Sequence, residues 1–235
     1  MKKIEYTRLP DYAVHVWRFP LIAARQEISA LGHWLDEREN EALDRMISRV
    51  ERDKRIVAWG RLRYILSRYL ELSPGDIRIE RGSSGRPEIV PREETDPSFS
   101  LTHSGNHALL AVSQMPVGID LENIRASIDA NVLSKRFFTR NESEAIARLS
   151  ADKRVETFFR LWVRKEAYLK AVGGSVPAGL SKCEVSAEVA DPRVLATNFE
   201  EMDSLSQLMD IPVHKGYLAA LAVQGSRADV RIYDL

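Results

Sequence analysis

The chain has 235 residues, of which 44% are hydrophobic and 29% are charged, and its formal net charge is zero. These values predict a globular protein with a substantial core, and they exclude a strongly basic field that would capture nucleic acid. Cys183 is the single cysteine, which excludes an internal disulfide. No apolar run approaches the roughly 20 residues that cross a bilayer. The first residues lack the apolar core of a signal peptide, so we expect a cytoplasmic protein that does not bind membranes.

In chain order, the first half of the sequence predicts a strand, two helices and then several strands. Residues 14–19 alternate between apolar and polar side chains and predict the first strand, and a polar helical stretch covers 25–50. A longer helix over 52–72 ends at a Ser-Pro-Gly turn that begins at Ser73. Further strands are predicted at 77–79, 98–103, 107–113 and 117–123, with loops at 82–85 and 91–97.

The second half opens with helices and closes with strands. Thr139 and Glu142 form a capping-box pattern that predicts the start of a helix. A long helix over 152–172 ends at a pair of glycines that begins with Gly173. The closing strands are predicted at 183–189, 213–224 and 228–233. The order strand, helices, strands therefore occurs twice, which indicates an α+β fold with two halves.

Chemistry-bearing residues gather in one predicted strand and in the long helix. Asp120 and Glu122 follow Gly118 in an alternating segment, so both carboxylates point to the same face of the strand. Glu166 and Lys170 are four residues apart and share one face of the helix. If the helix packs beside the strand, three carboxylates converge next to an ammonium group. Such oxygen ligands suit Mg²⁺ bound against a phosphate, whereas the alternative is a solvated strand and a surface ion pair.

Lys165 is an unexpected residue within the long helix. It falls in the middle of an apolar stripe, so it must either extend to solvent or be held by an anion. The stripe consists of Phe158, Leu161, Trp162, Tyr168, Leu169 and Val172. A surface pair of Glu166 and Lys170 would not explain Lys165, whereas a phosphate and metal site at the edge of this helix would explain all three residues.

A basic stretch over residues 45–69 carries eight basic side chains against two acidic ones. Three interpretations remain open for it: a solvated helix face, a site for a multiply phosphorylated ligand, and a footprint for RNA. Binding to RNA would bring a steep dependence on salt.

Five segments in chain order resemble motifs of 4′-phosphopantetheinyl transferases of the monomeric, surfactin-synthetase-activating type. The segments lie between about residue 50 and residue 180. They are Gly85-Arg86-Pro87, Phe99–Gly105, Val117–Glu122 in the pattern G-x-D-x-E, Arg136–Glu142, and Trp162–Lys170 in the pattern W-x-x-K-E-A-Y-x-K. One departure is Thr102, where the family more often has a serine before the histidine.

The resemblance implies a fold of two similar α/β lobes with pseudo-twofold symmetry, residues 1–115 and 116–235, with the active site in the cleft between them. It implies transfer of 4′-phosphopantetheine from coenzyme A to a serine of an apo acyl or peptidyl carrier protein, a small acidic helical domain. The second product is adenosine 3′,5′-bisphosphate. The implied cofactor is Mg²⁺, which Mn²⁺ can replace, and the implied state is a monomer.

The resemblance also implies roles for individual residues. Asp120, Glu122 and Glu166 are expected to bind the metal, and Glu166 and Lys170 to be catalytic. Glu142 either caps its helix or supports the acceptor serine. The residues expected to bind coenzyme A are Lys54, Arg55 and Arg61 at the 3′-phosphate, Gly85, Arg86 and Pro87 at the adenine end, His103 and Ser104 at the phosphates, and Lys165 and Lys170.

Two other function classes remain as alternatives: a Mg²⁺-dependent phosphohydrolase acting on coenzyme A or a nucleotide, and a basic module that binds nucleic acid. Release of bisphosphate in the absence of a carrier protein would identify a phosphohydrolase. Binding of nucleic acid that is unaffected by loss of Glu166 would identify a basic binding module. The sequence does not indicate which carrier protein or pathway is served.

Overall fold

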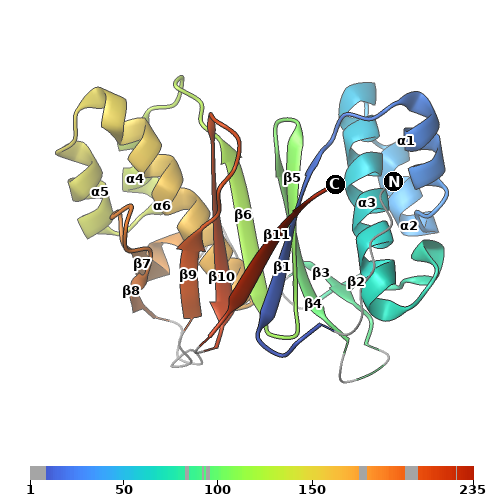
Figure 1. Cartoon of the computed structure of the whole chain (residues 1–235). Helices are drawn as coiled ribbons and strands as arrows, with labels where there is room; N and C mark the ends of the chain where they lie inside the picture. Colours follow the sequence, from blue (N-terminus) through green and yellow to red (C-terminus); the bar gives the residue numbers. More distant parts are fainter. Residues whose placement is uncertain are drawn as a thin grey trace. The chain divides into compact units, whose positions relative to one another are not determined.

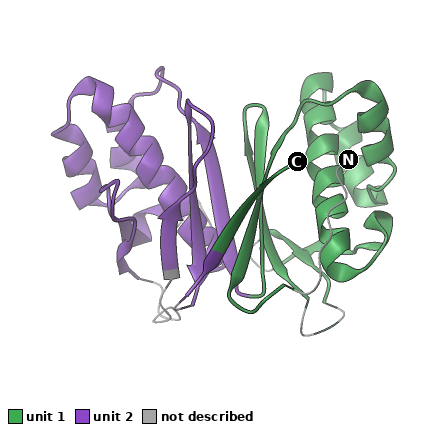
Figure 2. Cartoon of the chain, viewed as in Figure 1, with its two compact units in different colours: residues 1–114, 230–235 green, residues 115–229 purple. Residues whose placement is uncertain are grey.

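The structure is a computed structural model that describes residues 9–82, 85–91, 93, 96–174, 179–198, 206–225 and 227–235. The fold is mixed α+β, as expected (Figure 1). Two compact units make up the chain, and they are coloured separately in Figure 2. Unit 1 comprises Met1–Gln114 and Val230–Leu235, and unit 2 comprises Met115–Asp229. The expected division assigned the last strand to the second lobe, whereas the structure assigns it to unit 1.

The described residues of unit 1 form ten elements. They are β1 (Ala13–Pro20), α1 (Arg25–Gly32), α2 (Glu37–Asp44), α3 (Arg49–Leu70), η1 (Pro74–Asp76), β2 (Ile79–Arg81), β3 (Pro87–Ile89), β4 (Ser98–Ser104), β5 (His107–Ser113) and β11 (Asp229–Asp234). The main sheet has the order β11-β1-β5-β4, and β2 pairs with β3 in a separate hairpin. Because β11 is hydrogen-bonded to β1, the end of the chain belongs to this unit, where Asp234 also pairs with Arg18 at 2.8 Å.

The core of unit 1 lies around α3, which contributes buried residues such as Leu62 and Ile65 that cluster with Trp17 and Leu110 of the sheet. The single helical stretch expected over 25–50 is wrong, because the chain breaks into α1 and α2. The second helix, α2, begins at Glu37 because Asp36 caps it. The Asp36 side chain accepts a hydrogen bond from the backbone N–H of Glu39 and completes a capping box.

The described residues of unit 2 form nine elements. They are β6 (Val117–Asn123), α4 (Ala130–Phe137), α5 (Arg140–Ala147), α6 (Ala151–Ala171), η2 (Leu180–Lys182), β7 (Cys183–Val185), β8 (Val194–Thr197), β9 (Ser206–Asp210) and β10 (Tyr217–Gln224). An antiparallel sheet of order β6-β10-β9 carries α6 packed across β6 and β10, and β7 pairs with β8. Phe158, Leu161 and Tyr168 of α6 lie in its core.

Close packing of α6 against β6 depends on Gly118. A Cβ atom at this position would lie 2.1 Å from the carbonyl oxygen of Ala167 and 2.4 Å from the backbone nitrogen of Ala171. Such distances are far inside van der Waals contact, so only glycine lets the helix backbone approach the strand this closely. Gly118 therefore sets the spacing between the strand and the helix that carry the acidic residues.

Several predicted boundaries differ from the structure. The strand expected over 183–189 ends at Val185, and the strand expected from 213 begins at Tyr217, directly after Gly216 with a positive φ of 88°. The short strand expected at 77–79 lies at Ile79–Arg81. The sequence reasoning missed α4, β3, β8 and β9. No helix among the described residues is long and apolar enough to cross a membrane.

Candidate active site

The acidic residues expected to form a site lie on β6 and α6 of unit 2, and the packing of these elements brings them together. Asp120 is buried on β6, and its Oδ1 accepts a hydrogen bond from Lys170 Nζ at 2.6 Å. The same ammonium group donates to the carbonyl oxygen of Ile119 at 3.2 Å and lies 3.4 Å from Oε2 of Glu166. Lys170 therefore joins the strand carboxylate to the helix carboxylate.

Glu122 lies two residues beyond Asp120, at the end of the strand. It is partly exposed and pairs with Arg125 at 3.7 Å. Both acidic residues belong to the register that pairs β6 with β10, where Asp120 lies opposite Ala220 and Glu122 opposite Leu218. The alternation expected for this strand is consistent with these positions, because residues two apart face the same side of a sheet.

The charges of Asp120 and Glu122 both act on Glu166. The pKa of Glu166 is raised to about 7, first by burial and then by the negative charge of Asp120, with Lys170 opposing and Glu122 adding to the rise. Burial alone would lower the pKa of Lys170, but the charges of Asp120 and Glu166 outweigh it and raise that pKa. The cluster thus holds excess negative charge that one lysine balances only in part.

Whether the three carboxylates fit a divalent cation depends on what such a cation requires, which is negative charge and oxygen ligands in a suitable arrangement. Among the described residues, no group of three or more His, Cys, Asp or Glu side chains stands in an arrangement ready to hold a metal. The Lys170 ammonium group lies between Asp120 and Glu166 instead. The donor chemistry nevertheless fits Mg²⁺, because carboxylate oxygens are the ligands that this ion prefers, and because the charges of Asp120 and Glu122, which add to the effect of burial on the pKa of Glu166, would gain from a shared divalent charge.

Lys165 and Glu142, both expected near the substrate, pair with each other inside unit 2. The Lys165 side chain is fully buried, and its ammonium group donates to a Glu142 carboxylate oxygen and to the carbonyl oxygen of Cys183. Glu142 also completes the capping box with Thr139 at the start of α5, which confirms that part of the prediction. The anion expected to hold Lys165 within the apolar stripe is therefore a protein carboxylate.

Sequence reasoning missed a second buried cation on the same helix. Arg164 is fully buried and forms a bidentate pair with Asp210 of β9 at 2.8 and 2.7 Å. It also donates to the carbonyl oxygens of Ser186 and Glu188, just after β7. The only available signal was a charged residue beside the apolar stripe, since its partner is 46 positions away.

The residues expected to bind coenzyme A other than Lys165 and Lys170 lie in unit 1. Lys54 and Arg55 are partly exposed on α3, and Lys54 pairs with Glu51 at 2.9 Å. Arg61 is buried further along α3, where it donates to the carbonyl oxygen of Pro20 at 2.6 Å and to Glu27 at 2.7 Å. Arg61 is therefore engaged by the protein itself, whereas Lys54 and Arg55 present charge closer to solvent.

The glycine-containing loop precedes β3 of unit 1, and the histidine segment lies at the end of β4. Gly85 has a positive φ of 78°, and its carbonyl oxygen accepts a hydrogen bond from Arg81 at 2.6 Å. Arg86 and Pro87 follow it into β3, where burial lowers the pKa of Arg86 and the charge of Glu88 opposes this. His103 and Ser104 end β4, with His103 exposed.

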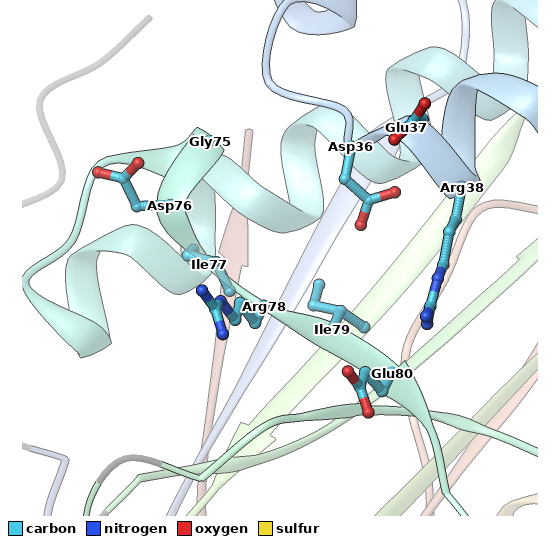
Figure 3. A pocket seen from close by; sticks show the side chains of 9 residues that line it. All are labelled: Asp36, Glu37, Arg38, Gly75, Asp76, Ile77, Arg78, Ile79 and Glu80. Atoms are coloured by element: carbon cyan, nitrogen blue, oxygen red, sulfur yellow. The ribbon is translucent and has the colours of Figure 1, made fainter.

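Two pockets in unit 1 do not coincide with the acidic cluster. One, of about 570 Å³, lies between α2, η1 and β2 (Figure 3). Carboxylates outnumber guanidinium groups among its charged side chains, which are Asp36, Glu37, Asp76, Glu80, Arg38 and Arg78. This balance disfavours a polyphosphate ligand. The other, of about 670 Å³, is lined by Arg61 together with Glu27 and Asp234.

Comparisons of the sequence with known proteins identify one family. Residues 116–222 match the 4′-phosphopantetheinyl transferase superfamily. The 4′-phosphopantetheinyl transferase HetI of Nostoc is 34% identical over 90% of this chain and 88% of its own length. The 4′-phosphopantetheinyl transferase Sfp of Bacillus subtilis is 30% identical over 53% of this chain and 54% of its own. A holo-(acyl-carrier-protein) synthase structure from Bacillus anthracis aligns with 48% of this chain and 97% of its own at 21% identity and a TM-score of 0.37.

Proposed function

Because this chain belongs to the 4′-phosphopantetheinyl transferase superfamily, we propose that it transfers 4′-phosphopantetheine from coenzyme A to a serine of an apo carrier protein. Adenosine 3′,5′-bisphosphate is the second product. The observation that supports this most strongly is the cluster of Asp120, Glu166 and Lys170, held together at 2.6 and 3.4 Å by the packing of α6 on β6. The cluster lies within the matched region and offers both charges that phosphoryl transfer needs.

Mg²⁺, or Mn²⁺ in its place, would be held by Asp120, Glu122 and Glu166, and it would neutralise and orient the pyrophosphate of coenzyme A. Glu166 is the proposed base for the serine hydroxyl. Burial and then the charge of Asp120 raise the pKa of Glu166 to about 7, which makes this carboxylate more basic than an exposed one, and a cation bound to it would lower that pKa again.

Lys170 is the proposed partner of the phosphate that leaves. Its ammonium group sits among carboxylates that raise its pKa, so it stays protonated at neutral pH. A protonated lysine can stabilise charge that develops on a phosphate oxygen, or it can give its proton to the leaving group. In this proposal Lys170 exchanges its bond to Asp120 for one to the substrate.

For coenzyme A we keep the sequence-based assignments in unit 1 as proposals. Lys54 and Arg55 would hold the 3′-phosphate, and Arg61 could join them only by giving up its bonds to Glu27 and Pro20. The remaining proposed contacts are Gly85, Arg86 and Pro87 at the adenine end and His103 and Ser104 at the phosphates. A charge-assisted contact to phosphate is among the stronger hydrogen bonds that proteins make.

The proposed partner is an acyl or peptidyl carrier protein, a small acidic helical domain that presents the acceptor serine. We further propose that the enzyme acts as a cytoplasmic monomer.

Glu166→Gln tests the proposed base, because it keeps the shape and a metal-capable oxygen but removes the basicity. It should lower kcat by about 10²–10⁴-fold, the usual range for loss of a general base, while coenzyme A affinity is largely kept. The matched control is Glu156→Gln on the same helix, whose carboxylate is half exposed and pairs with Arg160. Single-turnover transfer and calorimetry of coenzyme A binding give the two quantities. A parallel loss of affinity without a selective loss of kcat would show that Glu166 is only a ligand.

A further inference from the structure

Lys165 and Glu142 form an ion pair that is buried within unit 2. Lys165 has no exposed side-chain surface, and Glu142 has 4%. Their charged groups bond directly to each other, and Lys165 also donates to the carbonyl oxygen of Cys183. The Lys165 ammonium group further lies 5.1 Å from the centre of the Phe138 ring. Protein atoms therefore enclose the Lys165 ammonium group, and coenzyme A could reach it only by displacing residues of the core.

The Glu142 carboxylate is equally committed to the protein. One oxygen accepts from the backbone N–H of Val185 at 3.0 Å. The other accepts from the backbone N–H and the hydroxyl of Thr139, at 3.0 and 3.2 Å, in addition to Lys165. A buried charge is tolerated when its hydrogen-bonding capacity is met, and here both oxygens are used. An acceptor serine would have to replace one of these internal bonds.

Together these bonds connect three segments at one point: the middle of α6 through Lys165, the first turn of α5 through Glu142, and β7 through Cys183 and Val185. The next residue of α6 is Glu166. On the strand side of α6, Gly118 allows the helix backbone into close contact with β6. The glycine contact sets how near the helix lies to the strand, whereas the ion pair resists rotation of the helix about its axis.

We propose that Lys165 and Glu142 form a positioning pair, which holds α6 at the rotation that directs Glu166 and Lys170 toward Asp120. The inference rests on the proposed function, because positioning matters only if Glu166 and Lys170 act in transfer. Replacing a buried ion pair by apolar residues is often neutral or stabilising, so stability alone does not account for it. The Arg164–Asp210 pair already ties the same helix to β9. What Lys165 adds is a second, angularly distinct attachment directly beside Glu166.

The test uses variants of the full chain in transfer assays with coenzyme A and an apo carrier protein. Lys165→Met leaves Glu142 without its cation and can impair folding. The decisive variant is therefore the double replacement Lys165→Met with Glu142→Gln, which removes both charges and keeps both shapes. The matched control is Ile146→Ala, which opens a cavity at a fully buried position of the same α5 helix and keeps both charges. Lys165→Arg measures how far a cation alone restores function.

We expect the double variant to melt no lower than Ile146→Ala, yet to lose about 10–100-fold in kcat, the scale of a misplacement near 1 Å. KM for coenzyme A should change less than about threefold, since no substrate contact is removed. Lys165→Arg should recover part of kcat. A tenfold rise in KM for coenzyme A with kcat kept would overturn the proposal and make Lys165 a substrate contact. A kcat equal to that of Ile146→Ala would reduce the pair to a structural role.

Amide hydrogen exchange provides a readout that does not depend on activity. The double variant should exchange faster than Ile146→Ala along residues 160–171 and 183–185, because α6 and β7 lose their shared attachment. Unchanged protection of these segments would contradict the proposal that the pair positions α6, even if the wild-type protein transferred 4′-phosphopantetheine normally. If wild-type protein modified none of the carrier proteins, the proposed function would fail instead, and the exchange data would still decide whether the pair holds α6.

Discussion

Gly118→Ala tests how far the acidic cluster depends on the approach of α6 to β6. The added Cβ would lie 2.1 Å from the Ala167 carbonyl oxygen, 2.4 Å from the Ala171 backbone nitrogen and 2.7 Å from Lys170 Cβ. Ordinary contact begins near 3.4 Å, so the helix must retreat by about 1.3 Å at this point. Overpacking of this kind costs about 1–3 kcal/mol and sometimes more.

The retreat should also separate Lys170 and Glu166 from Asp120, because the helix backbone that moves carries both side chains. A displacement near 1 Å can cost about 10²-fold in rate. Urea denaturation would measure the stability of Gly118→Ala, and single-turnover transfer would measure its rate.

Gly75→Ala is the control for this prediction, because a Cβ at Gly75 meets nothing within 4 Å and the residue does not have a positive φ. It should lie within about 1 kcal/mol of wild type in stability and keep its activity. If Gly118→Ala were as stable and as active as Gly75→Ala, the close approach of α6 to β6 would have no part in assembling the site.

Three further predictions concern the thiol, the metal and the 3′-phosphate. Burial raises the pKa of the Cys183 thiol to about 11, with the charge of Lys165 opposing, so a thiol reagent at pH 8 should react only as fast as the protein unfolds. Since the unfolded thiol ionises near its ordinary pKa of 9.0 and the folded one does not, stability should fall as pH rises from about 9 to 11. Chelation with EDTA and the substitution Asp120→Ala should each abolish transfer. Added Mg²⁺ or Mn²⁺ should restore the activity of the wild type but not that of the variant. Full wild-type activity in the presence of chelator would contradict a requirement for the metal ion. Lys54→Ala with Arg55→Ala should raise KM for coenzyme A but barely change KM for dephospho-coenzyme A, and an undiminished difference between the two substrates would refute the assignment.

Local patterns were enough to predict the elements that carry the site. The alternation around Asp120 predicted β6, and the helical spacing that ends before Gly173 predicted α6. Each depends on neighbours within one or two turns of chain, so a sequence window contains the necessary information. The pairing of Glu166 with Lys170 followed in the same way, because residues four apart always meet on a helix.

Long-range pairing accounts for most of what the sequence did not reveal. Lys165 meets Glu142 across 23 positions, and Arg61 meets Glu27 across 34, so no local pattern distinguishes these buried partners from ligands. Lys165 was expected near a phosphate because a lysine within an apolar stripe needs an anion, whereas Arg61 was assigned to the 3′-phosphate from the family resemblance. The structure supplies that anion from the protein, and only the packed core shows which carboxylate it is.

Mass spectrometry of carrier proteins is the most direct test of the central claim. The protein would be incubated with coenzyme A, Mg²⁺ and a panel of apo acyl and peptidyl carrier proteins, each beside a variant in which the acceptor serine is alanine. The account predicts a pantetheinyl mass increase on at least one carrier, none on its alanine variant, and release of adenosine 3′,5′-bisphosphate in equal amount. Release of the bisphosphate with every carrier unmodified would contradict the account and identify a phosphohydrolase.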